Sequence, residues 1–407
     1  MTLYEKTRSV ILSNLVSAEN RKIGIEEECI IYNAKNQRIP VNQCNQFSAS
    51  DLLSFMNTNN NNNGSYSLEP GGQLEWASPP LKDLHSINKA LESHKELRKK
   101  TIEQHGLKII SYGVEPEHIP GSVDLIDELK YKLMNDSMRK NGTMGKWMMR
   151  NTASIQINFD TTSEKEMEEM VFIADCLQPT AAYLFSNSPY QNGRSVGNKN
   201  IRSLIWENTD NSRCRNLIDH GIITSDGLID NYIKYMFKVP GIFELDSSGR
   251  CTQTDKTLGE RLFELEKNNK LRKLDILAAL HQIFTNVRLK NLVEVRGSDR
   301  TPIGYELAPV AFWTGLLTVN SIRSEILKVV KKWTIKDRYN FNKISLGLDN
   351  TQIGPEGLSY QAWNKWAAGL ALSGLKSRKL GEEVYFEKFY NIIELDGPFS
   401  IQSKING

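Results

Sequence analysis

The stretch L-E-P-G-G-Q-L-E-W, at residues 68–76, places two acids, Glu69 and Glu75, on either side of a Pro-Gly-Gly turn. Because side chains alternate between the two faces of a strand, Gln73 and Glu75 share one face, and the apolar residues beside them share the other. Such a pattern by itself is typical of an ordinary hairpin with a solvated outer face. Whether Glu69 and Glu75 have a functional role therefore depends on the other parts of the chain.

Three further stretches repeat the alternation, at residues 23–32, 152–160 and 288–296. In the first of them, Glu26 and Glu28 fall on one face and most of the apolar residues fall on the other. Glu27 is the exception, because it is an acid on the apolar face. The first stretch therefore resembles residues 68–76 in having one face that packs and one that carries acids.

The alternation is cleanest in residues 152–160, whose polar side chains share one face against three apolar ones. These polar residues are Ser154, Gln156, Asn158 and Asp160. In residues 288–296, Glu294 and Arg296 share a face opposite two valines. We therefore predict that the four polar faces line one concave antiparallel sheet.

Composition excludes several classes of protein. A chain of 407 residues with 39% apolar and 24% charged residues can bury a large globular core. Its net charge is only +3, and no long Lys/Arg block occurs, so we expect no nucleic-acid partner. No apolar run approaches the roughly 20 residues that span a bilayer, which predicts a cytoplasmic protein without a membrane partner. The five cysteines form no C-x-x-C pair, and this argues against zinc.

Helical patterns fill most of the remaining chain. Residues 81–104 predict a long charged helix, and residues 163–176 and 179–185 predict two separate helices. Residues 307–330 are apolar on most faces, which indicates a buried helix behind the sheet. Because no repeat or linker divides the sequence, we predict one α+β domain over residues 1–407, with helices on the apolar side of the sheet.

The polar faces would bring five acids into one concavity, namely Glu26, Glu28, Glu69, Glu75 and Glu294. Repulsion between them would either raise their pKa values or require cations. Oxygen ligands without His or Cys favour Mg²⁺ or Mn²⁺ over zinc, and Mg²⁺ sites commonly combine carboxylates with substrate phosphates. The pattern therefore points to a phosphate-bearing substrate.

Four arginines could bind the anionic groups of such a substrate. Arg202 and Arg296, together with Arg150 and Arg213, offer planar guanidinium groups that match carboxylate and phosphoryl oxygens. No Walker A or G-x-G-x-x-G motif occurs, which argues against a P-loop kinase and a Rossmann oxidoreductase. Spacing alone leaves open the alternative that each acid is an exposed or salt-bridged structural residue.

Six segments, in this order along the chain, carry a resemblance to a known family. They are I-G-I-E-E-E at 23–28, L-E-P-G-G-Q-L-E at 68–75, S-I-Q-I-N-F-D at 154–160, F-S-N-S-P-Y at 185–190, I-R-S-L-I-W-E-N-T-D at 201–210 and E-V-R-G-S-D at 294–299. Together they resemble glutamate–cysteine ligase of the plant and proteobacterial type. The resemblance covers about residues 20–320, and the helical part at 321–407 is less diagnostic.

The resemblance implies a fold similar to the catalytic domain of glutamine synthetase, with a curved antiparallel sheet holding Mg²⁺ and ATP. It also implies that ATP phosphorylates the γ-carboxylate of glutamate and that the amine of cysteine attacks the acyl phosphate. The implied metal ligands are Glu26, Glu28, Glu69, Glu75, Gln156 and Glu294. The implied nucleotide-binding residues are Gln73, Gln156, Asn158 and Arg213. The implied substrate-binding residues are Arg150, Asn151, Tyr190, Arg202, Trp206 and Arg296, of which Arg202 and Arg296 would also be catalytic.

One departure from the family pattern affects the amine acceptor. Where the family usually reads M-L-R-T-C-T-V-Q, this chain reads M-R-N-T-A-S-I-Q at residues 149–156, so the family arginine falls on Asn151 and the arginine here is Arg150. If this segment is a strand, a shift of one residue turns that side chain to the opposite face. Cysteine is the acceptor that the resemblance implies, and this departure leaves two alternatives open: a γ-glutamyl ligase that uses another amine, and a non-catalytic relative that binds glutamate or nucleotide. The regulatory disulfides of plant members have no counterpart among these cysteines, so we expect no redox switch.

Overall fold

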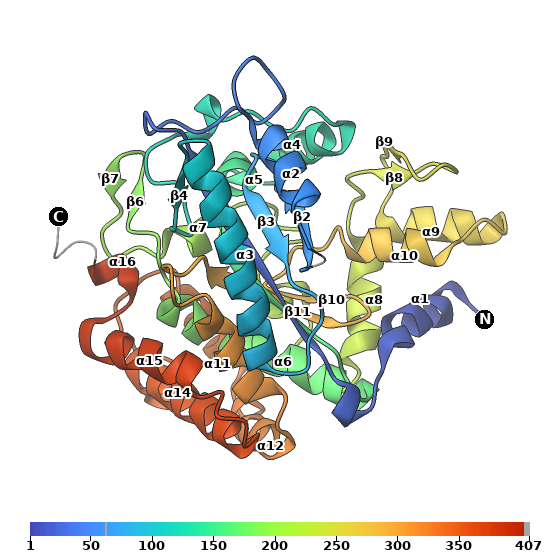
Figure 1. The fold of residues 1–407 in the computed structure, drawn as a ribbon. Helices are drawn as coiled ribbons and strands as arrows, with labels where there is room; N and C mark the ends of the chain where they lie inside the picture. Colours follow the sequence, from blue (N-terminus) through green and yellow to red (C-terminus); the bar gives the residue numbers. More distant parts are fainter. Residues whose placement is uncertain (62, 403–407) are drawn as a thin grey trace.

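The four alternating stretches lie together in one antiparallel sheet (Figure 1). The computed structural model describes residues 1–61 and 63–402, and its main sheet has seven strands in the order β10-β11-β5-β1-β3-β2, with β4 paired to β1. These strands are β1 (Ile23–Tyr32), β2 (Ser65–Leu68), β3 (Leu74–Ala77), β4 (Lys108–Ile110), β5 (Ser154–Phe159), β10 (Val287–Leu289) and β11 (Val293–Asp299). The predicted antiparallel sheet built from separate segments is therefore confirmed.

The register of this sheet sets the predicted polar residues side by side. Glu28 on β1 lies opposite Glu75 on β3, and Glu26 on β1 lies opposite Gln156 on β5. β11 pairs with the other edge of β5. Because directly opposed residues project from the same face of a sheet, the acids of β1 and β3 share a surface with the polar side chains of β5.

One predicted strand is a hairpin instead. Residues 288–296 divide into the end of β10 and the start of β11, so that Arg288 lies opposite Glu294 on the neighbouring strand. The chain reverses where the Lys290 N–H donates to the Leu292 carbonyl oxygen, at 3.0 Å. An asparagine, a common turn residue, lies at the centre of this reversal and was the signal for a turn.

Two helices pack directly on the sheet, and two more cover them (Figure 1). The inner helices are α6 (Glu164–Leu184) and α11 (Leu307–Leu317), and the outer ones are α14 (Tyr360–Ser377) and α15 (Val384–Asp396). Every residue of α11 is buried, which confirms a buried helix behind the sheet. The predicted helix over 307–330 is nevertheless two helices, because α11 ends at Leu317 and α12 (Asn320–Val330) follows.

Glycines set how closely α11 and α14 approach each other. A Cβ atom on Gly315 would lie 2.1 Å from the carbonyl oxygen of Ala371, and one on Gly374 would lie 2.0 Å from the carbonyl oxygen of Gly315. Both distances are far shorter than a van der Waals contact, so the two backbones touch at this crossing.

Helix α6 continues through Pro179, where we predicted a break between two helices. Proline removes one helical hydrogen bond and usually kinks or ends a helix. Here residues 170–184 are all buried, so packing on the sheet outweighs the local preference. The Pro179 carbonyl oxygen also accepts a hydrogen bond from the Tyr360 hydroxyl on α14.

The other elements surround this framework. They are α1 (Leu3–Ile11), α2 (Ala49–Thr58), α3 (Leu84–Gln104), α4 (Leu129–Asn141), α5 (Gly145–Asn151), β6 (Tyr190–Gln191), β7 (Arg194–Ser195), α7 (Ile201–Glu207), α8 (Leu228–Lys238), β8 (Glu244–Leu245), β9 (Cys251–Thr252), α9 (Leu258–Lys267), α10 (Lys273–Leu280), α13 (Ile335–Ile344) and α16 (Phe399–Gln402). The largest buried cluster includes residues from α1 through α15. The single domain over 1–407 stays a prediction, and residues 62 and 403–407 lie outside the described part.

Glu27, the acid on the apolar face of β1, is fully buried in a cluster of basic groups. Its carboxylate lies 2.7 Å from Arg98, 2.5 Å from Arg300 and 2.8 Å from the Nε2 atom of His94. Burial alone would raise the pKa of Glu27, but the guanidinium groups of Arg98 and Arg300 hold it well below its usual range. The cluster ties β1 to α3 and to the chain after β11.

We predict that Glu27→Gln strongly destabilises the fold, because it leaves Arg98 and Arg300 buried without their counter-charge. Breaking a buried ion pair in this way costs about 3–5 kcal/mol. Urea unfolding would show a lower midpoint for the variant. The matched change Glu19→Gln, at an exposed site, should leave the midpoint unchanged, and equal midpoints for the two variants would contradict the prediction.

Candidate functional site

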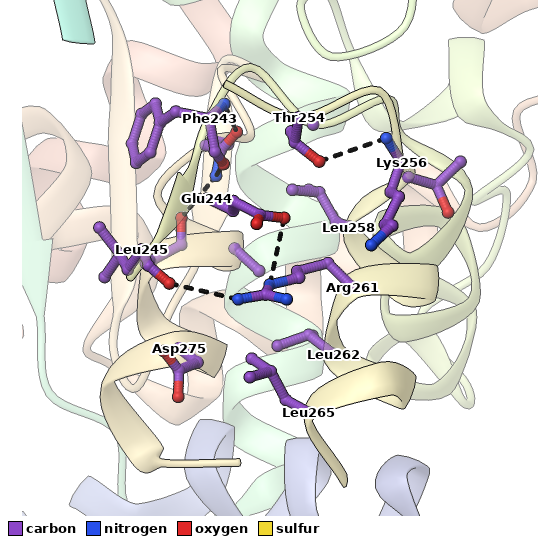
Figure 2. Close-up of a pocket in the computed structure, with 15 residues that line it drawn as sticks. Phe243, Glu244, Leu245, Thr254, Lys256, Leu258, Arg261, Leu262, Leu265 and Asp275 are labelled. Carbon is purple, nitrogen blue, oxygen red and sulfur yellow. Dashed lines mark hydrogen bonds and ion pairs between the residues drawn. The ribbon is translucent and has the colours of Figure 1, made fainter. Parts of the chain in front are cut away.

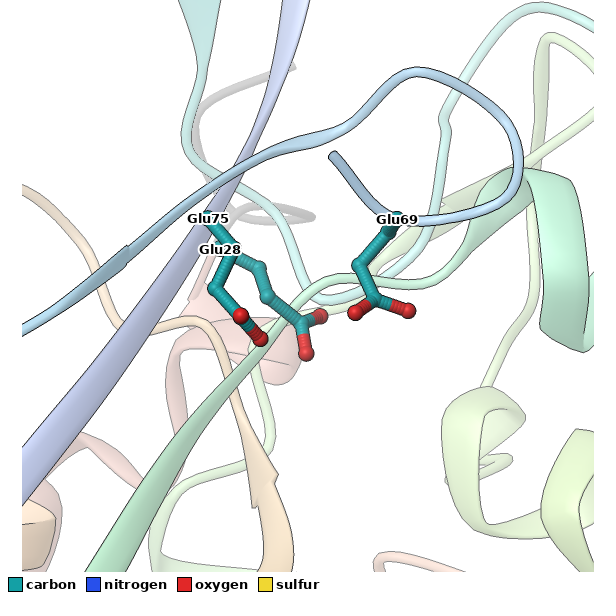
Figure 3. A group of neighbouring side chains, drawn as sticks. All are labelled: Glu28, Glu69 and Glu75. Atoms are coloured by element: carbon teal, nitrogen blue, oxygen red, sulfur yellow. The ribbon is translucent and has the colours of Figure 1, made fainter. Parts of the chain in front are cut away.

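Three acids meet on the polar side of the sheet. Glu28 comes from β1, Glu75 from the neighbouring β3, and Glu69 from the turn that joins β2 to β3. One carboxylate oxygen from each residue lies within 4.8 Å of the other two (Figure 3). Residues distant in sequence therefore present three carboxylates to one point, as the sequence pattern predicted.

The Pro-Gly-Gly turn brings Glu69 to this point. The Glu69 carbonyl oxygen accepts from the Gly72 N–H at 2.8 Å, and Gly72 has a φ of +76°. A turn with proline at its second position, followed by a left-handed glycine, is a common three-residue hairpin loop. A Cβ atom on Gly71 would lie 2.5 Å from the Cα atom of Arg150, so only glycine allows this close approach.

The acids are in an environment that disfavours their charge. Burial, followed by the charges of Glu75 and Glu28, raises the pKa of Glu69 well above its usual range. Burial also raises the pKa values of Glu28 and Glu75. For Glu26, burial and then the charges of Glu294 and Glu75 raise the pKa to about 7. A cation between these carboxylates would offset both the desolvation and the repulsion.

The side chains around two of these acids fix their orientation. Glu28 accepts hydrogen bonds from the Ser154 backbone N–H and hydroxyl, both at 2.8 Å, and from the Gln156 amide at 2.7 Å. Glu75 accepts from the Ser67 hydroxyl at 2.7 Å. Such supporting contacts are usual around carboxylates that bind metal. The donor set consists of carboxylate oxygens, from one buried and two half-buried glutamates, without nitrogen or sulfur, and it fits a hard divalent cation such as Mg²⁺ or Mn²⁺.

Glu294, also predicted as a metal ligand, is already neutralised by cations. Arg288 lies 2.7 Å away, Lys290 2.8 Å and Arg296 2.7 Å. Burial acts to raise the pKa of Glu294, but these three charges hold it well below its usual range. Its role as a metal ligand stays a prediction. Arg288 and Lys290 were missed as site residues, although both lie on the same face of a stretch that we had singled out.

Arg202, Arg296 and Trp206 form a basic and aromatic wall beside the acids. The guanidinium carbons of Arg202 and Arg296 lie 5.7 and 6.0 Å from the Trp206 ring centroid. Burial lowers the pKa of Arg202, and among the described residues its Nε atom and the Trp206 Nε1 atom have no hydrogen-bond partner. Both residues line a small polar cavity with Gln178 and Arg215. Unpaired donors at a cavity suit a carboxylate or phosphoryl ligand.

The amides predicted to bind nucleotide connect the two halves of the site. Gln156 donates to Glu28 at 2.7 Å and accepts from Arg296 at 2.5 Å, so it bridges the acidic and basic groups. Asn158 donates to Glu26 at 2.8 Å. Gln73 is buried and donates to the Thr152 carbonyl oxygen at 2.8 Å, which supports the turn. Contact of these residues with a nucleotide stays a prediction.

The segment that carries Arg150 and Asn151 is helical, and the expected strand is wrong at these positions. Both residues lie in the last turn of α5, where one step rotates the side chain by about 100° and does not reverse it. The Arg150 Nε donates to the Val123 carbonyl oxygen at 3.0 Å, and the Asn151 amide donates to the His118 carbonyl oxygen at 2.7 Å. Both side chains are thereby fixed against the loop before α4.

Two other predicted residues lie in different settings. Arg213 is fully buried, pairs with Asp210 at 2.8 Å and donates to the carbonyl oxygens of Gln282 and Pro240. Its side chain is fully buried in these structural contacts, and its contact with a nucleotide stays a prediction. Tyr190 is half-buried in the short strand β6, and its predicted substrate contact stays untested.

A separate hollow lies beneath the β8–β9 hairpin, between α9 and α10 (Figure 2). Leucine side chains line it, and Arg261 crosses it to pair with Glu244 at 3.2 Å and to donate to the Leu245 carbonyl oxygen at 3.4 Å. None of the predicted site residues lines this hollow. The predicted site residues therefore lie at the main sheet and not in the hollow under the β8–β9 hairpin.

Comparison with known proteins agrees with this geometry. The profile of glutamate-cysteine ligase family 2 (GCS2) matches residues 22–397. The chain belongs to this family. Glutamate–cysteine ligase A of Oryza sativa subsp. indica is 32% identical over 283 residues, which cover 67% of this chain and 56% of that protein. Glutamate–cysteine ligase of Arabidopsis thaliana is also 32% identical, over 67% of this chain and 53% of that protein. The chain thus matches little more than half the length of these family members.

A solved glutamate–cysteine ligase shares the fold. The glutamate–cysteine ligase of Francisella tularensis, crystallised in complex with AMP, superposes with a TM-score of 0.58 at 14% identity and covers 97% of this chain and 85% of that one. The predicted α+β ligase fold is confirmed by this match. In the described part of the chain, no helix is long and apolar enough to cross a membrane.

The raised pKa of Glu26 predicts how stability changes with pH. In the unfolded chain a glutamate has a pKa of about 4.3, whereas in the fold that of Glu26 is about 7. The folded protein therefore binds this proton more tightly, and the resulting stabilisation is complete at low pH and is lost as the pH rises through 7. Without divalent cation, the Tm of the wild type should fall more between about pH 5 and pH 8 than that of Glu26→Gln. Equal pH slopes in the two melting series would refute this.

Proposed function

We propose that the chain is an ATP- and Mg²⁺-dependent ligase that joins the γ-carboxylate of L-glutamate to the amine of L-cysteine. The observation that carries the proposal is the meeting of Glu28, Glu69 and Glu75 beside the guanidinium groups of Arg202 and Arg296. One half of the site attracts a cation, and the other attracts an anion. Membership of the glutamate–cysteine ligase family supports the same reaction.

The residues could divide the chemistry between them. Arg202 and Arg296 would bind glutamate and the transferring phosphoryl group, because phosphoryl transfer depends mainly on positioning and on stabilising developing charge. Glu28, Glu69 and Glu75, with Glu26 beside them, would hold Mg²⁺ or Mn²⁺, which when bound neutralises phosphate charge. The γ-carboxylate oxygen would take the terminal phosphoryl group and release ADP. The amine would then attack the acyl carbon, and phosphate and a proton would leave.

A γ-glutamyl ligase with another acceptor is the second candidate, and Asn151 favours it. This neutral, fully buried amide stands where the family sequence usually has an arginine, and among the described residues its Oδ1 atom has no hydrogen-bond partner. A non-catalytic relative is less well supported, since the acids and arginines that the reaction needs are all present. Cytoplasmic location, a lack of membrane and nucleic-acid partners, and the absence of a redox switch stay predictions. The two plant enzymes named above are chloroplastic.

The reaction can be tested with a panel of amines. Purified protein, ATP, Mg²⁺ and glutamate should yield ADP together with a product of the mass of γ-glutamylcysteine when cysteine is added. If the rate of ADP release does not depend on cysteine but increases with a different amine, the result would support the second candidate. ATP binding without any product across the panel would contradict both ligase proposals.

Removal of the metal or of Glu75 should abolish product formation without loss of the fold. Chelation with EDTA should stop the reaction, and added Mg²⁺ should restore it. Glu75→Ala should weaken Mg²⁺ binding by at least about tenfold, as measured by calorimetry. The Tm should not fall, because the Glu75 side chain is only half-buried and its loss relieves repulsion. Glu168→Ala, at a half-buried acid on α6, is the matched control and should bind Mg²⁺ normally. Normal binding by Glu75→Ala would remove Glu75 from the metal site.

A further inference from the structure

Glu69 differs from its two neighbours in how it is held. Glu28 and Glu75 accept hydrogen bonds from serine and glutamine side chains, whereas no described residue donates to the Glu69 carboxylate. Its place in the site is therefore set by the backbone of the turn at residues 69–73. Whatever fixes this turn also fixes the third carboxylate.

One buried guanidinium group binds the turn and the adjoining helix at the same time. Arg38 donates through Nη2 to the Gly71 carbonyl oxygen at 2.6 Å, and through Nη1 to the Arg150 carbonyl oxygen at 3.1 Å. Its side chain is only 7% exposed. Because the fork of an arginine is planar and rigid, a single residue can join two backbone carbonyls in a fixed geometry.

The charge of Arg38 is balanced by an acid that is itself held on several sides. Glu115 is fully buried and lies 3.2 Å from Arg38. It accepts hydrogen bonds from the Tyr32 hydroxyl and from the backbone N–H groups of Glu117 at 3.0 Å and His118 at 3.2 Å. Arg38 is therefore anchored in the body of the protein, and the turn is anchored to Arg38.

Neutral contacts complete the attachment of the turn. The Pro70 carbonyl oxygen accepts from the Ile126 N–H at 2.9 Å, and Gln73 donates to the Thr152 carbonyl oxygen at 2.8 Å. Gly71 leaves no space for a side chain against Arg150. Among the contacts that the described residues make with this turn, the one from Arg38 carries a full charge, so its loss should loosen the turn most.

We propose that Arg38 is a positioning residue for Glu69: by joining the Gly71 carbonyl to the end of α5, it holds the Glu69 carboxylate at the cation site. The proposal rests on the proposed function in one respect only, that Glu69 is a metal ligand. The described contacts of the Arg38 guanidinium are with Glu115 and with the carbonyl oxygens of Gly71 and Arg150, and not with any of the three carboxylates. Its effect should therefore be seen in metal affinity and in the mobility of the turn.

The test uses the full chain and two matched variants. Arg38→Met removes the guanidinium group, and Arg338→Met removes an equally buried one, 5% exposed, that pairs with Asp175 on α6. Both should lower the Tm. The Mn²⁺ affinity, measured by electron paramagnetic resonance, should be about 10–100-fold lower for Arg38→Met than for wild type. For Arg338→Met it should be unchanged. Arg38→Lys keeps the charge but not the planar fork of the guanidinium group, so its Mn²⁺ affinity should lie between those of wild type and Arg38→Met.

Hydrogen exchange separates a failure of this proposal from a failure of the proposed function. The backbone amides of residues 69 and 71–73 should exchange faster in Arg38→Met than in wild type and Arg338→Met, with or without metal. Wild type that binds no Mn²⁺ would refute the metal assignment, and faster exchange would then still support the Arg38 contact with the turn. Equal Mn²⁺ affinities for the two methionine variants, or unchanged exchange in the turn, would overturn the proposal. If Arg38→Met does not fold, the same two measurements on Arg38→Lys decide it.

Discussion

The repulsion between closely spaced carboxylates is the constraint around which this structure is arranged. Glu28, Glu69 and Glu75 present their oxygens to one point at a depth where charge is poorly solvated. In the described part of the chain no lysine or arginine forms an ion pair with them, whereas three such side chains pair with Glu294 on the same sheet. Acidic and basic groups are thereby kept apart and linked through the neutral amide of Gln156. A site divided in this way suits a ligand that carries both a cation and anionic groups.

Three consecutive acids on β1 show how environment decides the behaviour of one residue type. Glu26 and Glu28 face the polar side, and burial raises their pKa values. Glu27 faces the helices, where two arginines lower its pKa despite complete burial. The outward acids therefore remain available to a ligand, while the inward one holds the sheet to α3. One face of β1 thus carries the acid that stabilises the fold, and the opposite face carries the acids of the candidate site.

Alternation in the sequence located the strands and most of the polar face, because a period of two depends only on local backbone geometry. The alternation could not predict contacts that arise from tertiary packing. Arg38 follows a strand without any motif, and its partners are two backbone carbonyls that no side-chain pattern reveals. Arg213 was chosen for its charge, but its fully buried position depends on the packing of segments around residues 240 and 282. The hairpin at Arg288 and Glu294 could have been predicted, since a turn-forming asparagine separates the two strands.

The crossing of α11 and α14 bears on the part of the sequence with the weakest family signature. Helix α11 is apolar on every side, so it depends on α14 and α15 to shield it from water, and the glycine contact leaves no room for substitution at that point. A chain that ended before α14 would expose the apolar surface of α11 behind the sheet that carries the acids. Such a fragment should aggregate, even though it would retain every residue of the acid and arginine groups. The last quarter of the chain is therefore needed for the fold, although it supplies none of the acids and arginines of the site.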